Sequence, residues 1–183
     1  MDDRAHPRTG FFHVLWTAKL QVQRFVMFAT SCIFTLLVFA QVIMRYVLDV
    51  PMYGVEEVAS FSAVWLYFIG GAHGAYGRGH ISASLIEVML PAGRRRQFIR
   101  ALSSLITAIL AGWMTMWALQ YLEWTVRKGT MSVELGVKMY WVHMSMPIGL
   151  TLMTLYFLLE FVEDAGTLWH GSRVTLPIMG ERR

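Results

Sequence analysis

The stretch FVMFATSCIFTLLVFAQVIMRYVLDVPMYGVEE, residues 25–57, decides how this chain folds. Its first 20 residues carry no charged side chain. A helix of that length crosses a hydrocarbon core of about 30 Å at about 1.5 Å per residue. Its last 13 residues place an arginine, an aspartate and two adjacent glutamates around Pro51 and Gly54, which signal a turn. The stretch therefore predicts a membrane-spanning helix that ends in a charged turn.

The composition of the whole chain is typical of a membrane protein. Of its 183 residues, 56% are hydrophobic and 15% are charged, whereas an ordinary soluble domain has about a quarter of its residues charged. Four apolar runs are predicted to span the membrane: residues 25–44, 58–77, 98–122 and 139–161. We expect an all-α integral membrane protein whose membrane domain covers residues 25–161. The single cysteine, Cys32, excludes an internal disulfide.

Basic residues are distributed unevenly among the segments outside the spans. Twelve lysines and arginines lie in the N-terminal segment 1–24, the middle connection and the C-terminal tail 162–183, and four lie in the other two connections. The positive-inside rule therefore predicts that both termini are cytoplasmic. Because the positive charge is explained by topology, no basic surface is left over for nucleic acid.

The middle connection contains a segment that is too short to span the membrane. The sequence ISASLIEVML, residues 81–90, repeats apolar residues at helical spacing and precedes three consecutive arginines. The arginines are candidates for contacts with anionic lipid headgroups: Arg94, Arg95 and Arg96. We expect an amphipathic helix lying in the cytoplasmic interface. The alternative is a plain amphipathic connector.

Small residues recur at helical spacing in the last three spans. The candidates for helix packing are Gly70 and Gly74 in the second span, Ser104, Ala108 and Gly112 in the third, and Ser145 and Gly149 in the fourth. Small residues let helices approach closely where lipid supplies no hydrophobic driving force. Pro147 also predicts a kink in the fourth span.

Within the spans, histidines are the only ionisable candidates for chemistry. His73 lies fifteen residues past the start of the second span and His143 four past the start of the fourth. Both spans run inward, so the two histidines differ in depth by roughly 16 Å and cannot share one haem iron. We expect them to form hydrogen bonds between helices or at the interface. No metal-ligand spacing or catalytic motif is present, so we predict no catalytic residue, no metal site, no cofactor and no enzymatic activity.

The charged turn allows three interpretations. Glu56 and Glu57 occupy the first turn of the second span, where the helix dipole favours a carboxylate, and Arg45 closes the first span. Arg45 could pair with a glutamate and clamp the hairpin, or the same groups could contact a partner protein. Ion binding is the third interpretation, although no third ligand is evident.

The run RYVLDVPMYGVEEVASFSAVWLYFIGGAHGAYGRGHIS, residues 45–82, resembles the signature of the small permease subunit of tripartite ATP-independent periplasmic (TRAP) transporters, the DctQ-like family. The matching positions are Arg45, Tyr46, Pro51, Glu56, Glu57, Trp65, Gly70, Arg78, His80 and Ile81. The chain length, the four spans and the interfacial helix are similar as well. The sequence departs from the pattern at Tyr53, Gly54, Ser60, Ser82 and Ser84.

The resemblance implies a role in transport across a bacterial inner membrane. In this family a small subunit binds a large membrane subunit that carries substrate and sodium, and a periplasmic substrate-binding protein delivers an organic acid. The chain would then be a scaffold for the large subunit, in contact with membrane lipid. The residues implied as a structural clamp or as partner contacts are Arg45, Tyr46, Glu56, Glu57, Arg78 and His80. A haem-binding or structural membrane anchor subunit of a redox complex is the alternative function.

Overall fold

The computed structural model describes residues 11–50, 53–76 and 94–170. Its elements are α1 (Phe11–Tyr46), α2 (Val55–Tyr76), α4 (Arg94–Lys128), α5 (Tyr140–His143) and α6 (Ser145–His170). Apart from one isolated β-bridge between Met131 and Lys138, every element in these residues is a helix. The all-α prediction is therefore confirmed for the part of the chain that the structure describes.

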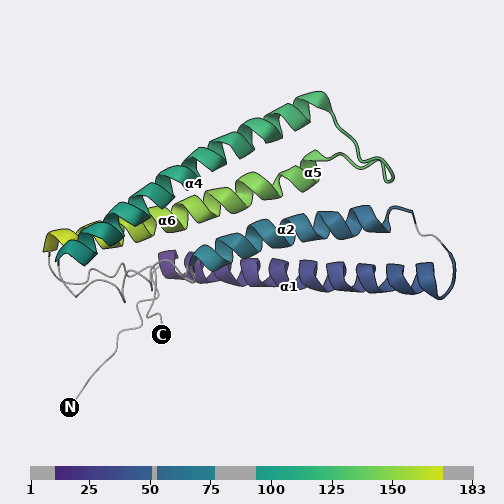
Figure 1. The fold of residues 1–183 in the computed structure, drawn as a ribbon, viewed down its shortest axis with the longest axis horizontal. Coiled ribbons are helices and arrows are strands. Elements are labelled where there is room, and N and C mark those ends of the chain that lie inside the picture. The colour runs from purple at the N-terminus through teal and green to yellow at the C-terminus, as the bar shows by residue number, and fades with distance from the viewer. Residues whose placement is uncertain (1–10, 51–52, 77–93, 171–183) are drawn as a thin grey trace, which may run out of the picture.

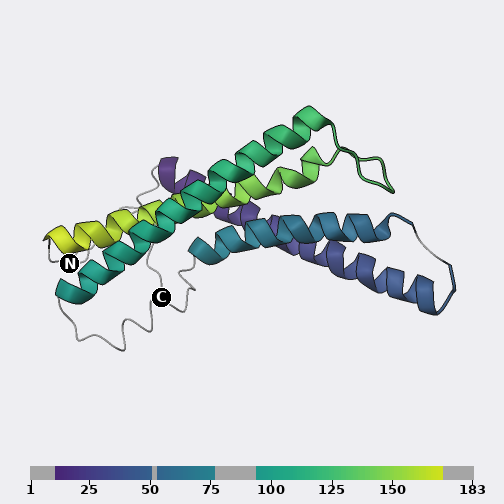
Figure 2. The same cartoon turned by 45° about the horizontal axis from the view of Figure 1, so that its top comes forward.

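The four long helices are arranged as an open row (Figure 1). α1 packs on α2, α2 packs on α6, and α6 packs on α4, while among the described residues the backbone of α4 is not close to that of α1 or α2. Turning the molecule shows that the α4–α6 pair crosses the α1–α2 pair at an angle (Figure 2). The chain therefore consists of two antiparallel hairpins that meet through α2 and α6.

The turn that follows α1 and the loop that follows α4 lie at the same end of the molecule (Figure 1). We call this end, formed by residues 47–50, 53–57 and 129–139, the turn end. α1 begins, α2 ends and α4 begins at the opposite end. This arrangement brings together two loops that are distant in the sequence.

Three helical stretches among the described residues are long and apolar enough to cross a membrane: Trp16–Tyr46, Arg94–Lys128 and Tyr140–Trp169. They correspond to the first, third and fourth predicted spans. The second predicted span is helical in α2, but α2 is not among the three, and its 22 residues include Glu56, Glu57 and His73. A fourth span and the cytoplasmic position of the termini therefore stay predictions.

The helices extend beyond the predicted spans. α1 begins at Phe11, inside the predicted N-terminal segment, and α6 continues to His170, inside the predicted tail. A helix can continue past the hydrocarbon because its backbone hydrogen bonds are satisfied internally on both sides of that boundary. The predicted interfacial helix 81–90, together with Arg78 and His80, lies outside the described residues.

The fourth predicted span is divided into α5 and α6 at Met144. Pro147 has no N–H group, so it cannot donate to the carbonyl four residues earlier, that of His143. The regular hydrogen-bond pattern resumes when Ile148 donates to the Met144 carbonyl at 3.3 Å. The hydrogen-bond pattern is therefore interrupted about one turn before Pro147, while a kink there stays a prediction.

A seam of small residues joins α4 to α6. The buried positions of α4 are Ala101, Ser104, Ala108, Ala111, Ala118 and Thr125. Their steps of three, four or seven residues form a heptad pattern, which is the spacing of left-handed helix pairs. Thr115 lies between Ala111 and Ala118 in this pattern. Its hydroxyl lies 2.9 Å from that of Thr154 on α6. Of the predicted candidates on α4, Gly112 lies beside this seam and is only partly buried.

α2 and α6 approach closely at Gly149. A Cβ atom added there would lie 2.6 Å from the Phe68 carbonyl oxygen and 2.7 Å from the Phe68 Cβ. Ser145, one turn earlier, is fully buried, and its hydroxyl donates to the Val142 carbonyl at 2.8 Å. Only glycine fits at position 149 without a shift of the α2 or α6 backbone.

The two glycines of the G-x-x-x-G pair on α2 make looser contacts. A Cβ atom at Gly70 would lie 3.9 Å from Met27 Cε on α1, which is an ordinary van der Waals distance. A Cβ atom at Gly74 would have no neighbour within 4 Å. The close approach of α2 thus depends on Gly149 of α6 and not on the paired glycines of α2.

Candidate functional site at the turn end

The carboxylate of Glu57 binds the loop that joins α4 to α5. The Ser132 hydroxyl donates to Glu57 Oε2 at 2.7 Å. Three successive backbone N–H groups donate to the same carboxylate, those of Val133 at 3.0 Å, Glu134 at 3.3 Å and Leu135 at 3.2 Å. The loop wraps around one carboxylate, which connects the first hairpin to the second.

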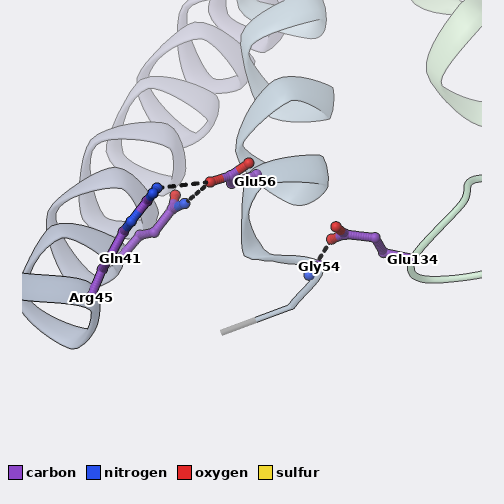
Figure 3. A network of polar contacts seen from close by, with 5 residues as sticks. All are labelled: Gln41, Arg45, Gly54, Glu56 and Glu134. Carbon is purple, nitrogen blue, oxygen red and sulfur yellow. Dashed lines mark hydrogen bonds and ion pairs between the residues drawn. The ribbon is translucent and has the colours of Figure 1, made fainter. Parts of the chain in front are cut away.

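A fifth hydrogen bond between the same two segments runs in the opposite direction. The carboxylate of Glu134 accepts a hydrogen bond from the backbone N–H of Gly54, directly before α2 (Figure 3). The start of a helix leaves N–H groups without partners in the helix, so a carboxylate there is favoured. We call the hydrogen bonds made by Glu57 and Glu134 between the α2 start and the 132–135 loop the reciprocal clasp.

Gly54 is required in the reciprocal clasp for two reasons. Its φ is +83°, a conformation that residues with a Cβ atom rarely adopt. An added Cβ atom would also lie 2.7 Å from Leu135 Cδ2. One of the departures from the DctQ-like pattern that the sequence resembles, Gly54, therefore lies where this backbone and this neighbouring loop both need glycine.

These hydrogen bonds hold the pKa of Glu57 below its usual range. The Ser132 hydroxyl is the largest cause, the partial burial of the carboxylate acts in the opposite direction, and the backbone N–H groups of the loop lower the pKa further. Glu57 stands just before the predicted span 58–77. Because the loop donates to the ionised form, the reciprocal clasp depends on Glu57 being charged.

Glu56 points the other way, toward α1 (Figure 3). Its carboxylate accepts a hydrogen bond from the Gln41 amide, and Arg45 Nη1 lies 4.0 Å from Glu56 Oε1. The side chains of Arg45 and Glu56 are 65% and 66% exposed, so water screens this pair. Tyr46 is exposed, and its ring centroid lies 5.8 Å from the Arg45 guanidinium carbon.

The two glutamates therefore have separate partners. The sequence led us to expect Arg45 to face either one, and the structure places it beside Glu56. The partners of Glu57, at positions 132–135, were not among the sequence candidates. The only signal for them in the sequence is an acidic residue in a short segment between Gly129 and Gly136. In the structure both glycines have positive φ.

The two histidines contact different neighbours. His143 Nδ1 lies 3.1 Å from the Thr125 hydroxyl on α4, and its ring lies 4.9 Å from that of Tyr121. The ring of His73 on α2 lies 6.1 Å from that of Tyr76. Among the described residues, no group of three or more His, Cys, Asp or Glu side chains is placed to hold a metal ion. This arrangement does not favour a haem anchor.

Arg94, Arg95 and Arg96 form the first turn of α4, at the end opposite the reciprocal clasp. Arg94 and Arg95 are exposed and Arg96 is partly buried. Their contact with lipid headgroups stays a prediction.

Comparison with known proteins identifies the family. No curated protein gives a significant match to the sequence. The sequence model described as tripartite ATP-independent periplasmic transporters, DctQ component, matches residues 34–167. That range is more than half of the chain, and it contains α2, α4, α5, most of α6 and both loops of the turn end. The chain therefore belongs to the DctQ family, the small membrane subunits of TRAP transporters.

Proposed function

We propose that this chain is the four-span scaffold of a sodium-driven TRAP transporter for organic acids in a bacterial inner membrane. The observation that carries the proposal is the family match over residues 34–167. The chain would hold a large membrane subunit that moves the substrate, and a periplasmic binding protein would deliver that substrate to the complex. Both termini would be cytoplasmic.

The chain path supports α2 as the fourth span. α1 and α4 both run toward the turn end, so the chain must return to the opposite end between them, and α2 runs in that direction (Figure 1). If α1 and α4 cross a bilayer, the segment between them has to cross it too. Residues 58–77 contain no Asp, Glu, Lys or Arg, so their transfer into lipid is not opposed by a charged side chain.

The middle of each predicted membrane span lacks charged residues. This supports the role of a scaffold rather than that of a transport pathway. No Asp, Glu, Lys or Arg occurs in residues 25–44, 58–77, 101–122 or 139–159. Substrate and ion pathways in membranes are usually marked by such residues. We therefore assign substrate and sodium to the large subunit.

The turn end supports a contact outside the chain. Val133 and Tyr53 are 96% and 84% exposed; the reciprocal clasp holds the backbone N–H of Val133 and that of Gly54, which follows Tyr53. Exposed aromatic and aliphatic side chains on a rigid support suit a protein contact. We propose that Arg45, Tyr46 and these residues face the periplasm and meet the large subunit or the substrate-binding protein.

Co-purification tests the scaffold role. A chain tagged at its C-terminus and extracted in mild detergent from its native membrane should retain a much larger membrane protein. The purified pair in vesicles, with the binding protein added, should take up an organic acid when a sodium gradient is imposed and should need no ATP. Recovery of the chain without a large partner, or uptake by the chain alone, would contradict the proposal.

Cysteine labelling tests the orientation. In a Cys32→Ser background, Val133→Cys should react with a membrane-impermeant maleimide in intact spheroplasts. A cysteine introduced at Arg94 should react only after the membrane is opened. The reverse pattern would place the turn end in the cytoplasm.

A further inference from the structure

Three aromatic rings and a lysine gather at the end of the bundle opposite the reciprocal clasp. Trp16 of α1, Tyr76 of α2 and Tyr156 of α6 have ring centroids 5.4 to 6.2 Å apart. Lys19 Nζ lies 3.3 Å from the Trp16 ring centroid and 4.5 Å from that of Tyr156. Together with Gln23 and His73, these residues form what we call the inner cluster.

The side-chain amide of Gln23 has a hydrogen-bond donor that is not used among the described residues. The Tyr156 hydroxyl donates to Gln23 Oε1 at 2.9 Å, and the two residues are only 1% and 3% exposed, respectively. This bond fixes the orientation of the amide and uses its acceptor. Gln23 Nε2 is buried and has no hydrogen-bond partner among the described residues.

Three neighbouring side-chain nitrogen atoms also lack a hydrogen-bond partner among the described residues. Trp16 Nε1, Lys19 Nζ and His73 Nδ1 are also buried without a hydrogen-bond partner in the described part of the chain. The indole, the ammonium and the amide nitrogen can only donate hydrogen bonds. The aromatic faces stabilise the lysine charge but offer no oxygen acceptor to these N–H groups. A buried polar group without a partner is costly, so three unpartnered donors at one place indicate a missing acceptor.

The position of the inner cluster fits a membrane surface. Trp16, Lys19 and Gln23 precede Phe25, where the first predicted span begins, and Tyr76 is the last residue of α2. Tryptophan, tyrosine and lysine gather at the level of the lipid headgroups, where phosphates are concentrated. Phosphates occur at both surfaces of a bilayer, so this argument does not depend on the orientation of the chain.

We propose that the inner cluster binds a phosphoryl group, supplied by the headgroup of an anionic phospholipid. The phosphoryl oxygens would accept hydrogen bonds from Lys19, Trp16 and Gln23, and the phosphate charge would neutralise the ammonium. The acyl chains would lie along the apolar surface of α1 beyond Phe25. The bound lipid would then connect α1 to α6, which share the Gln23–Tyr156 hydrogen bond but whose backbones are not in contact.

Thermal unfolding of the full chain in detergent tests this site. Phosphatidylglycerol should raise the unfolding midpoint, whereas diacylglycerol with the same acyl chains should raise it less. Lys19→Met should weaken the apparent affinity for phosphatidylglycerol about tenfold or more, because it removes a charge-assisted hydrogen bond. Trp16→Phe keeps the ring and removes only the N–H group, so it should weaken binding less and in the same direction.

A matched control is available at the end of α4. Lys128 Nζ lies 4.7 Å from the Trp124 ring centroid, a contact of the same kind on an exposed surface. Lys128→Met should leave the response to phosphatidylglycerol unchanged. Equal responses of Lys19→Met and Lys128→Met, or equal stabilisation by phosphatidylglycerol and diacylglycerol, would overturn the proposal.

Inorganic phosphate at constant ionic strength distinguishes the two sources of the phosphoryl group. A midpoint shift that matches that of the lipid and depends on Lys19 would support the phosphoryl site and reject lipid as the source. Little response to inorganic phosphate, with a full response to phosphatidylglycerol, is the expected result. These measurements use the chain alone, so they are independent of any partner subunit.

Discussion

At the turn end, the Glu57 carboxylate accepts hydrogen bonds from one hydroxyl and three backbone N–H groups. At the inner cluster, by contrast, the N–H groups of Trp16, Lys19 and Gln23 find no acceptor in the described chain. The Glu57 carboxylate is satisfied by the chain itself, whereas four buried nitrogen atoms of the inner cluster have no hydrogen-bond partner among the described residues. The difference separates a structural contact, which the protein closes by itself, from a cluster that we propose binds another molecule.

The largest effect should come from Gly149→Ala, which forces apart the α2–α6 contact that lies between the two regions. The added Cβ would stand 2.6 Å from a backbone oxygen, so α2 or α6 must move. Overpacking of this kind costs about 1–3 kcal/mol. We expect a lower unfolding midpoint and a weaker response to phosphatidylglycerol. Gly74→Ala, which meets nothing within 4 Å, is the control and should be nearly neutral. Equal midpoints for the two variants would show that this contact does not hold the bundle.

The second largest effect should come from Glu57→Gln, which weakens the reciprocal clasp and leaves the inner cluster intact. The neutral amide is a poorer acceptor than the carboxylate, so the amides of Val133, Glu134 and Leu135 should exchange their hydrogens faster. Hydrogen exchange read by mass spectrometry measures this directly. Glu56→Gln is the control, because Glu56 interacts with Gln41 and Arg45 of α1. Unchanged protection of the loop in Glu57→Gln would show that the clasp is not what orders it.

Acidification should weaken the reciprocal clasp. Because the pKa of Glu57 is lowered in the folded chain, its contribution to stability is complete above the ordinary pKa of a glutamate. That contribution is lost as the pH falls through the lowered value. Loop protection in the wild type should therefore decrease on acidification, and the Glu57→Gln variant should show a flatter profile. A wild-type profile as flat as that of the variant would argue against an ionised Glu57 in the clasp.

The smallest effect on stability should come from Arg45→Ala. Its pair with Glu56 is exposed and 4.0 Å long, and exposed pairs contribute about 0–1 kcal/mol. We expect an unfolding midpoint close to that of the wild type. If the same variant recovers less of the large subunit on purification, Arg45 acts on the partner and not within the hairpin. A large loss of stability in the isolated chain would instead make Arg45 part of the turn-end structure.

The sequence was sufficient to predict those features that depend on local spacing. Apolar runs located the helices, Pro147 located the break near Met144, and small residues at Ser104 and Ala108 indicated the face of α4 that meets α6. Helix ends were less accurate, because charged residues near Phe11 and His170 hide helices that continue beyond the hydrocarbon.

The reciprocal clasp and the inner cluster could not be predicted in the same way. Glu57 and Ser132 are 75 residues apart, and Gln23 and Tyr156 are 133 apart. Which of two adjacent glutamates turns toward α1 and which toward the loop is decided by how the two hairpins meet. The spacing within either hairpin carries no information about that choice.

The open row of helices has a consequence for permeation. A ring of helices that encloses an aqueous lumen would require the first and last members of the row, α1 and α4, to meet. Here they are held apart by α2 and α6. A hydrophilic solute that crosses the bilayer beside this chain therefore needs the rest of its wall from another polypeptide.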